Sequence, residues 1–130
     1  QILIPTTMNI FIKFRAMLRL HEAKRMADNA HEKDGERYYV MPTSNGQLIV
    51  MHKRDLRILK RKHYVPQNAT TQHMFNECFY CTPYRNGDGA LTPDGIREKE
   101  RQYLSWVTAI RNIRKANRAM TKAVRKTKKG

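Results

Sequence analysis

The chain has 130 residues, of which 40% are hydrophobic and 28% charged, and its formal net charge is +15. This length fits one domain with a modest core, and we expect no second complete domain within these residues. No apolar run approaches the roughly 20 residues that span a bilayer, whereas the charge favours an anionic partner.

Two short segments hold most of the net charge. Lys and Arg outnumber Asp and Glu by 6 to 1 in residues 53–62 and by 9 to 0 in residues 111–130. Residues 1–52 carry +2 and residues 63–110 carry −1. The sequence therefore predicts a nearly neutral domain with two basic surfaces.

The expected organisation has three parts. Residues 1–7 precede Met8, which we interpret as the natural start, so they are an extension outside the fold. Residues 8–112 are expected to form a single small α+β domain that is mostly helical. Residues 113–130 are expected to form a basic C-terminal arm, either helical or disordered until a polyanion binds.

The first predicted element is an amphipathic helix from Met8 to about His31, ended by Asp34 and Gly35. Its apolar residues recur at steps of three and four, as one helix face requires. They are Ile10, Phe11, Phe14, Met17, Leu18, Ala23, Met26, Ala27 and Ala30.

A β-hairpin is predicted next, from the β-rich runs at residues 36–41 and 47–51. Asn45 and Gly46 between them suit a type I′ turn. Pro42 has no N–H to donate, so its strand should lie at an edge, or the loop should be longer than two residues.

Two short helices are predicted to follow. The first covers residues 53–62, directs Leu56 and Leu59 inward, and stops before Pro66 because the residue preceding proline disfavours helical geometry. The second covers about residues 70–80. Its buried side is expected to consist of Met74, Phe75 and Phe79. The glycine-rich residues 85–89 are interpreted as a turn.

The last predicted element is a long helix that starts at Thr92, Pro93 and Asp94 and runs to about Thr127. A hydroxyl cap, a proline in the first turn and a carboxylate at the positive end of the dipole favour this start. We expect its first half to pack on the hairpin and the first helix. Its apolar stripe comprises Ile96, Tyr103, Val107, Ile110, Ile113, Met120 and Val124.

The end of this helix carries a basic stripe roughly opposite Ile113, Met120 and Val124. Its spacing of three and four places the cations on one side, where they could follow several phosphates. The stripe comprises Arg111, Arg114, Lys115, Arg118, Lys122, Arg125, Lys126 and Lys129. Binding to an anionic membrane surface is the weaker interpretation, because the opposite face offers few large apolar residues.

Residues 53–62 form the second predicted basic surface. Its cations are Lys53, Arg54, Arg57, Lys60 and Arg61. Nearby Tyr38, Tyr39, His63 and Tyr64 could stack on unpaired bases. The alternative, which we favour for the tyrosines, is that they are partly buried residues of the hairpin and core.

The two cysteines, Cys78 and Cys81, have the C-x₂-C spacing of a zinc-binding pair. His63 and His73 could complete such a site, although their separation matches no strong spacing rule. Residues 63–66 and Asn68 resemble pieces of the HNH endonucleases, but those enzymes usually place a cysteine pair before the histidine segment. We favour two structural cysteines in a reducing, cytoplasmic compartment, with no metal and no other cofactor.

Catalysis has no positive support in the sequence. Ser44 lies in a predicted turn and Ser105 in a predicted helix, and no nucleophile motif surrounds either residue. We therefore do not expect an enzyme.

Three segments carry a resemblance to known proteins. Residues 37–51 read Arg-Tyr-Tyr-Val-Met-Pro-Thr-Ser-Asn-Gly-Gln-Leu-Ile-Val-Met, residues 59–62 read Leu-Lys-Arg-Lys, and residues 77–87 read Glu-Cys-Phe-Tyr-Cys-Thr-Pro-Tyr-Arg-Asn-Gly. Over roughly residues 10–115 the chain resembles short proteins of gut Bacteroidales and their phages. The resemblance implies a phage or mobile-element origin and transfers no functional residue.

Together these features predict a nucleic-acid-binding accessory protein that contacts the phosphate backbone of DNA or RNA without strong sequence specificity. A structural or adaptor protein, such as a virion or assembly component that binds an acidic protein surface, is the alternative. A zinc-dependent nuclease is the second alternative.

Overall fold

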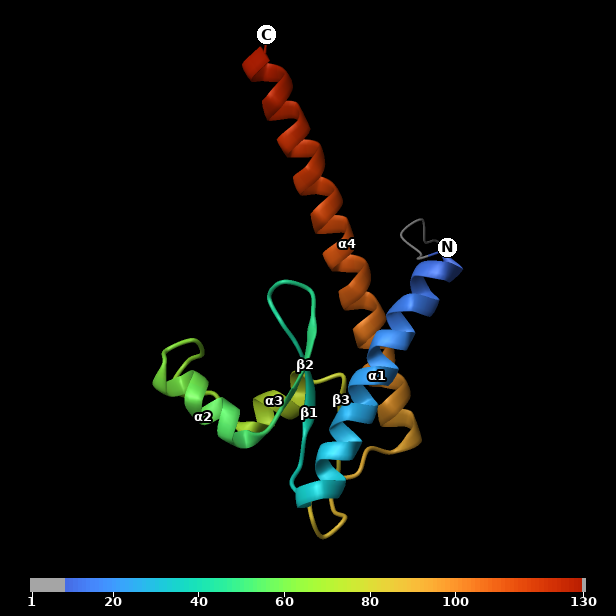
Figure 1. Ribbon diagram of the computed structural model, residues 1–130, viewed down its shortest axis with the longest axis vertical. Helices are drawn as coiled ribbons and strands as arrows, with labels where there is room; N and C mark the ends of the chain where they lie inside the picture. The colour runs from blue at the N-terminus through green and yellow to red at the C-terminus, as the bar shows by residue number, and fades with distance from the viewer. Residues whose placement is uncertain (1–8, 130) are drawn as a thin grey trace.

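The computed structural model describes residues 9–129 and confirms the α+β, mostly helical class (Figure 1). The extension before Met8 lies outside the described residues, as does the side chain of Lys129. The elements in chain order are α1 (Ile10–Asp34), β1 (Tyr39–Pro42), β2 (Leu48–Met51), α2 (Lys53–Arg61), α3 (Thr71–Glu77), β3 (Tyr80–Cys81) and α4 (Pro93–Lys129).

Helix α1 has the predicted end, and Ala23 and Ala27 of its predicted apolar stripe are buried, but the large apolar residues near its start are not. Its N-cap Asn9 accepts from the backbone N–H of Ile12, and Gly35 closes it in the left-handed conformation with φ of 73°. The buried face consists of Ala16, Leu20, Ala23 and Ala27. Phe11, Phe14 and Leu18 point outward, with 76%, 63% and 50% of their surface exposed.

This correction has a packing explanation. Three alanines let the α1 backbone approach the sheet closely, and Leu20 fills the space between them. At 100° per residue, Phe11, Phe14 and Leu18 lie on the side of α1 opposite Ala16 and Leu20, so they face away from the sheet. Size and hydrophobicity therefore indicated the wrong side in the first half of the helix, whereas Ala23 and Ala27 in the second half are buried as predicted.

The sheet is antiparallel, with strand order β2-β1-β3. Pro42 pairs with Leu48, so the hairpin loop has the five residues 43–47. The predicted type I′ turn is wrong, and the alternative drawn from Pro42, a loop longer than two residues, is confirmed. Only Gly46 in this loop has a positive φ, 82°, whereas type I′ needs two such residues. Strand β3 pairs with Tyr39 and Val40 only, so Pro42 lies past its end.

The predicted helix over residues 70–80 is too long, because α3 ends at Glu77 and β3 follows. Phe79 donates its backbone N–H to Val40, and Thr82 donates to Tyr38. Cys78 still donates to Met74 as the helix ends, but from Phe79 onward the backbone bonds to β1 and to Tyr38 beside it instead of continuing the helix. Leu56 and Met74 are buried as predicted, and Phe79 is buried from an extended segment instead of a helix.

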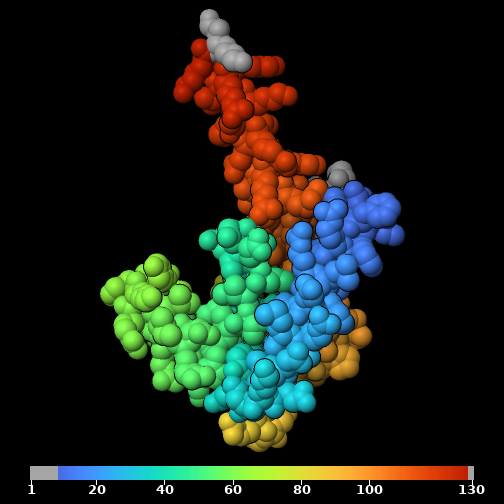
Figure 2. All heavy atoms as spheres, viewed as in Figure 1, coloured from blue at the N-terminus to red at the C-terminus, as the bar shows by residue number. Residues whose placement is uncertain are grey.

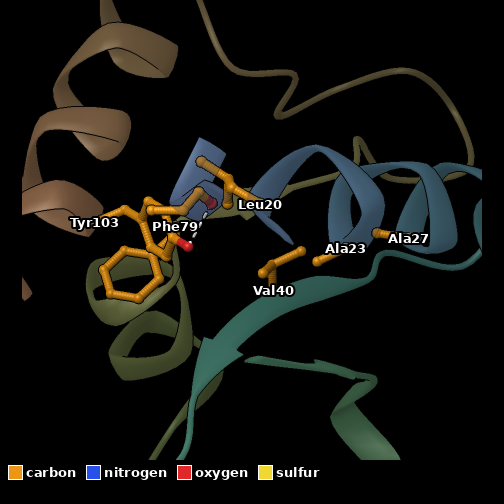
Figure 3. Packing of buried hydrophobic residues seen from close by; sticks show 7 residues of the cluster. Leu20, Ala23, Ala27, Val40, Phe79 and Tyr103 are labelled. Carbon is orange, nitrogen blue, oxygen red and sulfur yellow. Dashed lines mark hydrogen bonds between the residues drawn. The ribbon is translucent and has the colours of Figure 1, made fainter. Parts of the chain in front are cut away.

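Successive residues of β1 point to opposite faces of the sheet, as in any strand. Val40 packs with Leu20 of α1, with Phe79 and with Tyr103 of α4 (Figure 3). Tyr39 packs on the other face, in a cluster completed by Met51, Leu56, Met74, Cys78 and Cys81. The domain therefore has three layers, with α1 and α4 on one side of the sheet and α2 and α3 on the other.

Helix α4 begins as predicted, with the Thr92 hydroxyl accepting from the N–H of Gly95 at 3.0 Å. Its first half is fixed by Tyr103, which is 1% exposed and donates to the carbonyl of Ala16 at 2.6 Å. Every residue from 111 to 128 is exposed, and this part of α4 extends away from the domain (Figures 1 and 2). No helix within residues 9–129 combines the length and apolar character needed to cross a bilayer.

Candidate nucleic-acid interface

The arm, residues 113–130, is a continuation of α4 wherever the structure describes it (Figure 2). The predicted stripe cations with described side chains, Arg111 through Lys126, are all exposed, and so is Lys128. No Asp or Glu occurs between residues 101 and 130. The positive charge of the arm is therefore not neutralised by acids of the same segment.

The two sides of the arm differ in character. At 3.6 residues per turn the stripe cations share one side, and the described arm is about 25 Å long at 1.5 Å per residue. Ile113, Met120 and Val124 lie on the other side and are 56%, 67% and 49% exposed. The apolar stripe of α4 thus continues past the point where the domain can cover it.

A groove of about 280 Å³ lies where α1, the hairpin loop and α4 meet. Four of the side chains that line it are arginines, Arg15, Arg19, Arg111 and Arg114, and Glu22 is the one acid. Its floor is mostly apolar and consists of Ile12, Ala16, Ala23, Met26, Leu48, Tyr103, Trp106, Val107 and Ile110. Arg111 and Arg114 also begin the basic stripe, so the groove and the arm form one continuous basic surface.

The hairpin loop is held against α4 by Arg114, which donates from Nη2 to the carbonyl of Asn45 at 2.9 Å. Two features of this position favour Gly46. Its φ of 82° disfavours an L side chain, and a Cβ would lie 2.6 Å from Nη2 of Arg114. The loop therefore fixes one wall of the groove.

Two groove residues, Arg15 and Arg19, were not among the residues predicted from the sequence. They lie four positions apart on α1, a spacing that places both on one helix face. That signal was present in the sequence, but only the fold brings this face opposite α4.

Helix α2, the second predicted basic surface, stands across the hairpin from α4 (Figure 1). Lys53, Arg54, Arg57 and Arg61 are exposed. Lys60 is partly buried and donates to the carbonyl of Ala69 at 2.9 Å. The structure therefore does not join α2 and the arm into one surface.

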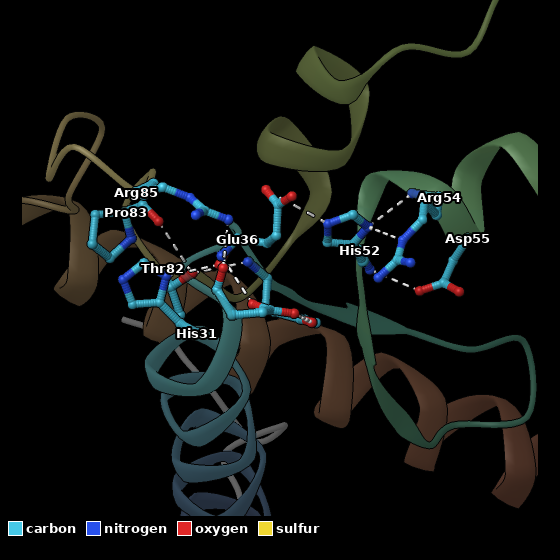
Figure 4. A network of polar contacts seen from close by, with 10 residues as sticks. His31, Glu36, His52, Arg54, Asp55, Thr82, Pro83 and Arg85 are labelled. Atoms are coloured by element: carbon cyan, nitrogen blue, oxygen red, sulfur yellow. Dashed lines mark hydrogen bonds and ion pairs between the residues drawn. The ribbon is translucent and has the colours of Figure 1, made fainter.

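The start of α2 is fixed by His52, which is 5% exposed (Figure 4). Its Nδ1 accepts from the backbone N–H of Arg54 at 3.1 Å, and the backbone N–H of His52 donates to the carboxylate of Asp55 at 2.8 Å. Nε2 faces the carboxylate of Glu36 at 3.8 Å. These contacts hold the exposed cations of α2 on a defined turn.

The aromatic residues near α2 divide into two groups. Tyr39 is buried, and Tyr38 is partly buried and donates its hydroxyl to Asp34 at 2.5 Å, as expected for residues of the hairpin and core. Tyr64 is 74% exposed, and His63 is exposed with φ of 63°. Only Tyr64 and His63 could therefore stack on a base beside α2.

Cys78 and Cys81 are buried free thiols surrounded by cations. Arg37 donates to the sulfur of Cys81 at 3.0 Å, and Lys99 donates to the carbonyl of Cys78 at 3.0 Å. Both cations oppose a divalent metal at these sulfurs. The neighbouring Cys78 thiol first, and then Arg37 and Lys99, lower the pKa of Cys81 to about 6 against the opposing effect of burial.

The zinc alternative lacks a ligand set in the described part of the chain. His63 and His73 are exposed, and His73 accepts from the backbone N–H of Thr70 at the start of α3. Among residues 9–129 no three His, Cys, Asp or Glu side chains are grouped closely enough to hold a metal ion. The HNH-like nuclease interpretation has no such group to rest on.

Comparison of the chain with protein-family models, with curated proteins and with solved structures found no match.

Proposed function

We propose that this protein is an accessory protein of a phage or mobile element and binds the phosphate backbone of nucleic acid. The arm and the groove arginines make the contacts. The observation that carries the proposal is the exposed end of α4, which holds eight Lys and Arg between residues 111 and 128 and no acid. A row of cations of this length on one helix side matches the repeated charge of a nucleic-acid strand.

The energetics of the arm support the same function. Like charges three and four positions apart destabilise an isolated helix, and the arm makes few contacts with the domain that could offset this repulsion. A bound polyanion removes the repulsion and releases counterions, so affinity should fall as salt rises. Contacts of this kind position a protein on a backbone and carry no sequence information.

The test compares charge removal at two places. Lys115, Arg118 and Lys122 in the arm are replaced by Gln in one variant, and Lys53, Arg57 and Arg61 of α2 in a matched variant. Gln is a good helix former, so both helices should persist. At low salt we expect the arm variant to lose at least about tenfold in affinity for a labelled oligonucleotide, and the α2 variant less than about threefold. Equal losses would contradict the assignment to the arm.

A second candidate function is that of a structural or adaptor protein, supported by the apolar side of the arm. Ile113, Met120 and Val124, flanked by cations, would suit an acidic amphipathic helix of another protein. Replacing these three residues by Gln should abolish such binding and leave nucleic-acid affinity within about twofold. A large loss of nucleic-acid affinity in this variant would show that the two functions share the apolar side.

A further inference from the structure

The groove between α1, the hairpin loop and α4 has a composition that phosphate contacts alone do not explain. A site for phosphate needs cations, and the four arginines supply them. Most of the other lining side chains are apolar, including Trp106, Val107 and Ile110. A ligand that uses the whole groove must combine an anionic part with a flat or apolar part.

We propose that the groove takes an unpaired base of a nucleic-acid strand, with the flanking phosphates on its arginines. This inference rests on the proposed function and deepens it, because it commits the protein to single-stranded or locally opened nucleic acid. In a duplex the bases are paired and stacked, so they cannot enter a recess between two helices.

The size and walls of the groove suit one base. Its volume of about 280 Å³ lies just below the roughly 300–1,000 Å³ of sites that hold drug-sized ligands. Trp106 packs against Phe79 and Tyr103, with ring centroids 5.4 and 6.1 Å apart, and also lines the groove. Its indole is therefore held in place by core contacts at a position where a base could stack.

The arginines are placed to hold the strand on both sides of that base. Arg15 and Arg19 come from α1, and Arg111 and Arg114 come from α4. A guanidinium can bind a phosphate with two parallel hydrogen bonds, so these side chains suit phosphate as well as carboxylate. From Arg114 the strand can continue along the cations of the arm.

Two other ligands with anionic and apolar parts fit less well. A membrane surface is broad and flat, and it cannot follow a recess bounded by three elements, whereas a flexible strand can turn one base inward. An acidic peptide could place carboxylates on the arginines, but its acidic side chains offer no flat ring to stack on Trp106, so it remains an outcome of the test.

Trp106 is the only tryptophan of the chain, so its fluorescence reports on the groove directly. The full chain is titrated with a labelled single-stranded oligonucleotide, with the same oligonucleotide lacking its bases, and with the matched duplex. Anisotropy of the label measures binding, and the fluorescence of Trp106 measures occupation of the groove. We expect the single strand to quench Trp106 and to bind about tenfold more tightly than its abasic counterpart.

Two matched variants locate the effect. Arg15→Gln with Arg19→Gln removes two charges from the groove, and Arg118→Gln with Lys122→Gln removes two from the arm. All four residues are exposed, so both variants should fold. The groove variant should lose the quenching and the preference for bases. The arm variant should lose affinity for the normal and abasic strands equally. It should keep the quenching of Trp106 and the preference for bases.

The outcomes separate this inference from the proposed function. Binding of all three oligonucleotides without quenching of Trp106, and without preference for bases, would overturn the base site and leave backbone binding intact. Equal quenching by a polyglutamate chain would overturn it in favour of an acidic peptide. No binding of any oligonucleotide at low salt would reject the proposed function itself.

Discussion

The guanidinium of Arg37 donates from Nη2 to the sulfur of Cys81 across 3.0 Å, and both side chains are buried. Lys99, also buried, lies nearby on the carbonyl of Cys78. Neither cation forms an ion pair with a carboxylate in the described part of the chain. The buried charge of Arg37 is therefore compensated by sulfur, the carbonyl of Gly89 and aromatic rings.

We predict that Cys81 is a thiolate at neutral pH, because its pKa is lowered to about 6. The thiolate absorbs in the ultraviolet, so a pH titration should show one step near this value. Cys81→Ser should remove the step. Arg37→Gln should move it to higher pH, because a charge-assisted hydrogen bond to the sulfur is lost. An unchanged step in Arg37→Gln would show that Arg37 does not stabilise the thiolate.

The same ionisation predicts how stability changes with pH. The folded-state pKa of Cys81 is lowered, so between about pH 6 and the ordinary value of 9.0 the unfolded chain binds more protons than the folded one. This contribution therefore rises with pH across that window and is lost as pH falls through about 6. The raised pKa of Cys78 has the opposite effect on stability, which it lowers as pH rises above 9.0. The urea midpoint of the wild type should therefore rise relative to that of Cys81→Ser as pH increases across this window. Midpoints that change with pH in parallel would show that ionisation of Cys81 does not affect stability.

Tyr103 joins α4 to α1, and its hydroxyl donates to the carbonyl of Ala16 at 2.6 Å. Tyr103→Phe removes only this buried hydrogen bond and should lower the free energy of unfolding by about 1 kcal/mol. Tyr64→Phe is the matched control, because Tyr64 is 74% exposed, and it should change stability by less than about 0.5 kcal/mol. Equal effects in urea denaturation would mean that the Tyr103 hydroxyl contributes nothing specific.

The arm should respond to a polyanion in a way that the domain does not. Its residues are exposed and its cations repel one another, so this part of the helix should open readily and its backbone amides should exchange with solvent rapidly in the free protein. Bound oligonucleotide should slow exchange in residues 113–129 and leave Leu20 and Val40 in the core unchanged. Hydrogen exchange followed by mass spectrometry measures both regions together. Protection in the arm without ligand would show that its helix is stable alone.

Local patterns predicted the elements whose partners lie close in sequence. The Thr92 cap and the Asp34–Gly35 ending mark the helix ends where the structure has them, because caps depend on neighbouring residues. Leu56 and Met74 were correctly placed inside. The α+β class followed from the order of these elements.

Features that depend on distant partners were missed. Strand β3 exists because Phe79 and Thr82 donate to the carbonyls of Val40 and Tyr38, and no pattern within residues 78–82 predicts that pairing. Phe14 points outward because α1 packs on the sheet through its alanines and Leu20, which lie on the other side of the helix. The groove arose in the same way, since Arg15 and Arg19 meet Arg111 and Arg114 only after α1 and α4 pack together.

Binding of a labelled duplex and a labelled single strand by the full chain, measured by fluorescence anisotropy across a salt series, tests the central claim most directly. If about six cations of the arm and groove neutralise phosphates, the logarithm of the association constant should fall against the logarithm of salt with a slope near −5 for the duplex and near −4 for the single strand. Absence of binding at low salt, or an affinity that does not change with salt, would contradict the account.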